Sequence, residues 1–130
     1  MIRISNEDVL RGLKKFKRLA KQDLLASNLT SNPQFWRTQA EARRTQYTEL
    51  MEIVEKDGVE MAYRHAVGRY ASLPRLASGE PTQPEPTLAG QRLALEMFFT
   101  MLGVTNKAAI HAAAAITHMP TDGIASGSFM

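Results

Sequence analysis

The sequence predicts an all-α protein with about five helices in a single domain of 130 residues. Apolar residues recur every three or four positions in the first half, which is the spacing of an amphipathic helix. Capping residues, prolines and glycines then divide the chain into segments of helical length. The expected order is an N-terminal helical lobe (1–72), a Pro-rich spacer (73–87), a C-terminal helical hairpin (88–119) and a tail (120–130).

The first helix is expected to begin at Ser5 or Asn6, either of which can cap it, and to end near Ala26. Glu7 and Asp8 fall in its first turn, where the helix dipole favours acidic side chains. Its apolar positions follow a helical repeat: Val9, Leu10, Leu13, Phe16, Ala20 and Leu24. Residues 28–32 are expected to form a loop.

Asn32 followed by Pro33 predicts the start of a second helix, which could extend to Lys56. Its expected buried face consists of Trp36, Ala40, Tyr47, Leu50, Met51 and Val54. Gly58 can end this helix, and the spacing of Asp57 and Glu60 suits a capping box for the next. The third helix would bury Val59, Ala62, Tyr63, Ala66, Val67 and Tyr70. One long bent helix is the alternative.

The last two predicted helices carry only three formal charges between Leu88 and Met119. Pro86 and Thr87 would begin the fourth helix and Gly103 would end it; Thr105 would cap a fifth from about 106 to 118. Arg92, Glu96 and Thr100 make one narrow polar stripe, while apolar residues point in almost every other direction. A chain this short has limited interior, so a partner subunit is a natural way to cover such a helix.

The sequence therefore predicts that the C-terminal helices form an oligomer interface. Its expected members are Leu95, Met97, Phe98, Phe99, Met101 and Leu102. The function hypothesis that follows is a non-catalytic interaction or assembly protein, whose partner is a second copy or another protein. The competing interpretation of the methionines is that they fill a core.

The net charge of +3 is unevenly distributed, because residues 1–72 hold 13 basic against 9 acidic side chains. Five basic residues without an acid among them lie on the first helix, mostly opposite its apolar face: Arg11, Lys14, Lys15, Arg18 and Lys21. Such a face can bind phosphates or an acidic protein, which makes a small nucleic-acid-binding regulator the alternative function. A solvated face, paired with the acidic stretch 49–60 of this or a second copy, explains the same pattern.

Residues 94–116 resemble a helix-turn-helix motif, with Leu102-Gly103-Val104-Thr105 as its turn. The resemblance covers about 20 residues and implies DNA reading by the second helix. That helix offers only Asn106, Lys107 and His111 near its start, whereas a recognition helix presents several polar side chains to base edges. Phe99 stands where the motif favours a small residue. These departures favour packing between helices.

No pattern in the sequence indicates catalysis, a cofactor, a metal or a small-molecule substrate. The chain has no cysteine, and His111 and His118 are seven residues apart, too far for one metal. The acidic residues Glu49, Glu52 and Glu55 fit a solvated helix face. The N-terminus lacks the apolar core of a secretory signal, and no stretch is long enough to span a bilayer. We therefore expect a cytoplasmic protein that is not an enzyme and has no membrane contact.

Overall fold

The computed structural model describes residues 3–73 and 85–104. Over these residues the protein is all-α, with four α-helices and no strand. The helices are α1 (Asn6–Ala26), α2 (Pro33–Asp57), α3 (Val59–Ser72) and α4 (Pro86–Met101). A short 3-10 turn, η1 (Ser27–Leu29), joins α1 to α2. The predicted fifth helix (106–118), the tail and most of the Pro-rich spacer lie outside the described residues.

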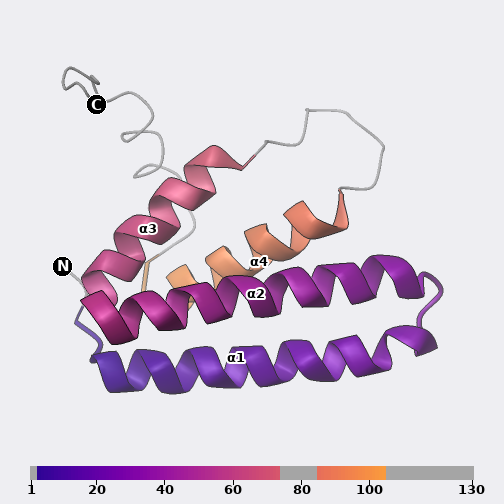
Figure 1. Ribbon diagram of the computed structural model, residues 1–130, viewed down its shortest axis with the longest axis horizontal. Helices are drawn as coiled ribbons and strands as arrows, with labels where there is room; N and C mark the ends of the chain where they lie inside the picture. The colour runs from indigo at the N-terminus through magenta and orange to yellow at the C-terminus, as the bar shows by residue number, and fades with distance from the viewer. Residues whose placement is uncertain (1–2, 74–84, 105–130) are drawn as a thin grey trace.

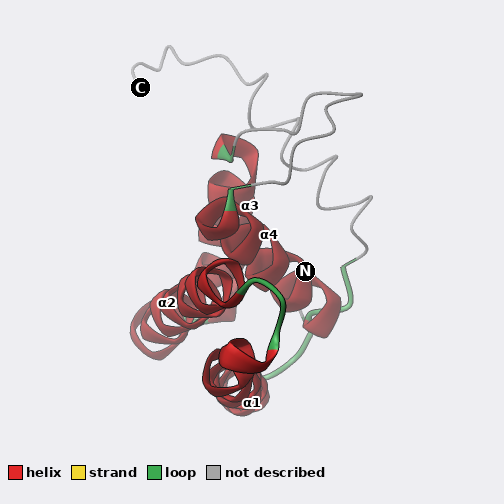
Figure 2. Cartoon of the chain, turned by 90° about the vertical axis from the view of Figure 1, so that its right-hand side faces the viewer, coloured by secondary structure: helices red, strands yellow, loops and turns green. Residues whose placement is uncertain are grey.

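The helix α2 lies at the centre of the molecule. It packs antiparallel to α1 along nearly its whole length and contacts α4 on another side (Figure 1). Viewed from the turn end of this hairpin, α1 lies on one side of α2 while α3 and α4 lie on the other (Figure 2). Contacts between α1 and α4 are few. The hairpin α1–α2 is thus a platform that α4 covers along one side.

The helix boundaries follow from local signals in the chain. The Ser5 hydroxyl accepts a hydrogen bond from the Asp8 amide at 3.1 Å, and the Asn32 side chain accepts one from the Phe35 amide at 3.4 Å. Gly58 adopts φ +96°, which favours glycine and separates α2 from α3. The predicted starts of α1 and α2 and the break at Gly58 are confirmed.

The start of α3 is capped differently from the prediction. No side chain of the expected Asp57–Glu60 pair caps it. Instead Asn6 Oδ1, 53 residues away, accepts a hydrogen bond from the Val59 amide at 3.1 Å. This bond also fixes the start of α1 against the start of α3. A capping box is a local device, whereas this cap depends on the tertiary arrangement.

One apolar core includes residues from all four helices. Its largest fully buried members are Tyr47, Phe98, Phe99, Leu13, Leu50 and Leu95. Phe99 makes edge-on ring contacts with Tyr63 and Tyr70 of α3, at centroid distances of 6.0 and 5.6 Å. The predicted core residues Tyr63, Tyr70 and Met51 are only partly buried. Because α4 shares this core, it completes the interior that α1, α2 and α3 begin.

The prediction that Trp36 is buried was wrong. Its side chain is 43% exposed, while its neighbour Phe35 is buried and contacts the Trp36 ring edge-on at 4.9 Å. Trp36 continues the stripe of Ala40, Tyr47 and Val54, which are buried, but it stands in the first turn of α2. Helical spacing predicts which face is apolar and not how far along the helix that face is covered.

Glycine sets the close approach of α4 to α2. A Cβ at Gly90 would lie 2.4 Å from the Gln39 carbonyl oxygen and 2.8 Å from the Ala42 Cβ. At the other end of α4, a Cβ at Gly12 of α1 would lie 2.2 Å from Met101 Sδ. Because glycine has no Cβ, α4 can pack closely against the hairpin at these two positions.

Candidate functional site

The basic face predicted on α1 is exposed. Arg11, Lys14, Lys15, Arg18 and Lys21 all lie on the side of α1 opposite its buried residues Val9, Leu13 and Ala20. Arg11 pairs with Asp8 at 2.9 Å. Among the described residues, the other four basic side chains form no ion pair. The acidic stretch 49–60 of the same copy therefore does not neutralise them. These cations are available to a partner.

The predicted oligomer-interface residues separate into two groups. Leu95, Phe98 and Phe99 have no exposed surface in the single chain, because α2 and α3 already cover them. Met97, Met101 and Leu102 are partly exposed, and Met101 fills the space left beside Gly12. The apolar character of α4 is thus largely satisfied within one copy. It does not require a second copy to cover Leu95, Phe98 or Phe99.

Large apolar side chains are exposed instead at the turn of the α1–α2 hairpin. Leu25, in the last turn of α1, is 72% exposed, and Leu29, in η1, is 89% exposed. Trp36, in the first turn of α2, is 43% exposed. We call Leu25, Leu29 and Trp36 the hairpin-end surface. These three side chains lie within residues 25–36, and exposed apolar side chains that cluster in this way commonly bind a partner.

A cavity of about 300 Å³ opens beside this surface, between α1, the start of α2 and α4. Its lining combines apolar and polar side chains: Asp23, Ala26, Thr30, Trp36, Gln39, Arg43 and Leu93. Arg43 Nη2 donates to Asp23 Oδ2 at 2.5 Å across it, so the two charges neutralise each other. Gln39 is only 7% exposed, and Arg43 Nε is buried without a hydrogen-bond partner among the described residues. The sequence analysis did not find this cavity, because its walls come from three helices.

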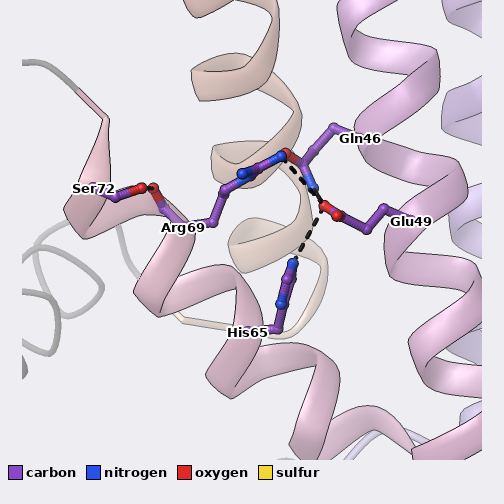
Figure 3. A network of polar contacts seen from close by, with 5 residues as sticks. All are labelled: Gln46, Glu49, His65, Arg69 and Ser72. Atoms are coloured by element: carbon purple, nitrogen blue, oxygen red, sulfur yellow. Dashed lines mark hydrogen bonds and ion pairs between the residues drawn. The ribbon is translucent and has the colours of Figure 1, made fainter. Parts of the chain in front are cut away.

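A second polar cluster joins α2 to α3 (Figure 3). Three side chains converge on Glu49 Oε1: Gln46 Nε2 at 2.8 Å, His65 Nε2 at 3.2 Å and Arg69 Nη2 at 3.9 Å. Burial acts to raise the pKa of Glu49, but hydrogen bonds from Gln46 and His65, with the charges of His65 and Arg69, outweigh it and lower that pKa. The cluster is half-exposed and its bonds are satisfied, so we interpret it as a clamp between helices.

The polar stripe of α4 has a structural role that its sequence did not reveal. The Tyr70 hydroxyl donates to Glu96 Oε2 at 2.8 Å, and the Arg92 guanidinium lies 5.6 Å from the Tyr70 ring centroid. Burial, together with the hydrogen bond to Glu96, raises the pKa of Tyr70. Two of the three stripe residues thus bind α3, and Thr100 is exposed.

Metal-ligating groups and membrane-spanning helices were sought among residues 3–73 and 85–104. These residues contain no group of three histidine, aspartate or glutamate side chains placed to hold a metal ion. None of the helices described is both long enough and apolar enough to cross a bilayer. No protein-family model matches the chain, and neither curated proteins nor solved structures give a match. The site must therefore be interpreted from its own geometry.

Proposed function

We propose that this protein is a non-catalytic interaction protein that assembles with a second copy of itself through the hairpin-end surface. The exposure of Leu25 and Leu29 carries this proposal. Burying a leucine side chain is worth about 1.5–3 kcal/mol, so covering both is a substantial driving force for association. The interface first expected on α4 moves to the hairpin end, because Leu95, Phe98 and Phe99 are occupied inside the chain.

The charge pattern supports association at this end. Residues 24–36 contain no Asp, Glu, Lys, Arg or His, although the chain carries a net charge of +3. The Arg37 guanidinium lies beside this stretch and donates to Asn28 Oδ1 at 3.0 Å, so two copies that meet here must keep their Arg37 side chains apart. Elsewhere on α1 the basic face would oppose such an approach.

Light scattering across a range of protein concentrations tests the proposal. We expect the wild-type protein to change from monomer to a larger species as concentration rises, with little dependence on salt. A double variant, Leu25→Glu with Leu29→Glu, should remain monomeric. Met61→Glu is the matched control, since Met61 is 47% exposed on α3, away from the hairpin end. A wild-type monomer at every concentration contradicts the proposal.

The basic face of α1 supports a second candidate function, nucleic-acid binding. Its supporting observation is that Lys14, Lys15, Arg18 and Lys21 are exposed without an acidic partner among the described residues. Phosphate contacts through these residues would bind without strong sequence preference. Association through the hairpin end would present two such faces on one particle.

Titration of a fluorescent 20-base-pair DNA duplex at several salt concentrations tests the second candidate. Binding should weaken steeply with added salt, because each phosphate contact releases counterions. The double variant Lys14→Glu with Arg18→Glu should abolish binding. Adding Glu52→Lys and Glu55→Lys to this double variant restores the net charge at another place, and we expect it not to restore DNA binding. Retention of DNA by the Lys14 and Arg18 variant contradicts this function.

A further inference from the structure

The hairpin end carries both a protruding apolar residue and a cavity. Leu29 in η1 is 89% exposed, and the cavity is lined by Ala26 and Thr30, its near neighbours in the chain. Trp36 borders the same cavity from α2, and Leu93 closes it from α4. The protrusion and the cavity therefore lie at the same end of the molecule, where η1 joins the two long helices (Figure 1).

The chemistry of the cavity specifies a neutral occupant. Asp23 and Arg43 already neutralise each other across it, so an occupant with a net charge would leave that charge uncompensated in a partly buried place. Trp36 and Leu93 offer contact to an apolar side chain.

The hairpin turn of this same chain meets both requirements. It carries exposed leucines at 25 and 29, and no charged residue between 24 and 36. Asn28 and Ser31 flank Leu29 with neutral polar side chains that are also exposed. A leucine side chain is small enough to enter a space of about 300 Å³ together with an adjoining polar group.

Building on the proposed self-assembly, we propose that two copies exchange their hairpin turns, so that Leu29 of each enters the cavity of the other. Leu29 and the cavity lie at the same end of one chain. A two-fold interface can therefore make both contacts at once, since each copy presents its leucine to the cavity of the other. Such an arrangement closes at two copies and does not polymerise. We expect this dimer to dissociate at roughly micromolar concentrations, because the contact is confined to one end of each copy and small interfaces are typically weak.

Complementation between two variants tests this geometry. Leu29→Glu removes the protruding residue but leaves the cavity intact, and Leu93→Glu alters the cavity but leaves the protruding residue intact. Each variant alone should dimerise at least about tenfold more weakly than wild type. An equimolar mixture should recover a heterodimer that is weaker than wild type, because one of its two contacts is complete.

Trp36 supplies a second readout, because it is the one tryptophan in the chain and lies in the cavity wall. Its emission should shift to longer wavelength when the wild-type dimer is diluted, and should shift back when the two variants are mixed. Circular dichroism establishes that each variant is folded. Should Leu93→Glu unfold, Ala26→Gln replaces it, since Ala26 is exposed and lines the same cavity.

The outcomes separate the two proposals. A wild-type monomer overturns self-assembly and the exchange together. A wild-type dimer that both variants leave unchanged supports self-assembly and overturns the exchange. Loss of dimer in each variant without recovery on mixing also overturns the exchange, and indicates that Leu29 of each copy meets Leu29 of the other. Recovery on mixing supports it.

Discussion

The two ends of the α1–α2 hairpin differ in what covers them. At the end near Gly58, Leu50 and Val54 of α2 are buried completely or nearly so, as are Val59 and Ala62 of α3. At the turn end, Leu25, Leu29 and Trp36 are exposed beside an open cavity, to which α4 contributes Leu93. Both ends are built from the same two helices. The difference shows that apolar residues of one hairpin become core or surface according to what packs against them.

The largest expected change in the free energy of unfolding comes from a substitution in the buried core. Phe99→Ala should lower the free energy of unfolding by about 3–5 kcal/mol, because Phe99 is fully buried and contacts Tyr63 and Tyr70. Leu29→Ala, at the open end, should change it by no more than about 0.5 kcal/mol in dilute solution. Urea unfolding followed by circular dichroism measures both. Similar losses for the two variants would mean that the ends do not differ as described.

Alanine substitutions at two glycines test how closely α4 packs against α2. Gly90→Ala should destabilise the protein by about 1–3 kcal/mol, since its Cβ would strike backbone of α2 at Gln39. Gly68→Ala on α3 should stabilise it by about 0.5–1 kcal/mol, because no atom lies within 4 Å of the added Cβ and alanine favours a helix. Thermal unfolding at one protein concentration compares them. Stabilisation by both substitutions would show that α4 lies farther from α2.

The smallest expected effect concerns the clamp between α2 and α3. Because the folded protein lowers the pKa of Glu49 below its ordinary value of 4.5, the carboxylate stabilises the fold above that value. This stabilisation is lost as the pH falls through the lowered pKa. Since Glu49 is more than one-third exposed, the effect at neutral pH should be below about 1 kcal/mol.

Unfolding of Glu49→Gln and wild type in urea, at neutral pH and at about pH 3, measures this effect. The difference between them should be present at neutral pH and smaller in acid. Glu55→Gln is the control, as Glu55 is exposed on the same helix without an ion pair among the described residues. A difference that grows in acid would contradict the assigned sign.

The sequence predicted those features of the fold that depend on neighbouring residues. Ser5, Asn32 and Gly58 bound helices because a cap or a positive φ involves only a few adjacent positions. It also placed the basic face of α1 correctly, since that face is defined by its position opposite a regular apolar stripe. It failed at Trp36, because helical spacing does not specify how far along a helix its apolar face is covered.

The candidate site was less predictable than the fold. The apolar character of α4 was interpreted as a surface for another subunit, yet Leu95, Phe98 and Phe99 pack inside one copy. Its polar stripe was recognised without a role, and in the structure Glu96 and Arg92 contact Tyr70. The hairpin-end surface was missed because Leu25 and Leu29 look like ordinary helix and loop residues until no neighbour is found to cover them.

By itself, therefore, the sequence determined that this protein is helical, where α1 to α4 begin or end, and which face of α1 carries the positive charge. These follow from spacing, capping and backbone preference, all of which are local. Only the tertiary structure decided that α4 is interior, that Asn6 caps α3, and that apolar side chains are exposed at the turn of the hairpin. Burial depends on every element that lies near a residue, and the spacing of residues along one helix does not specify its neighbours.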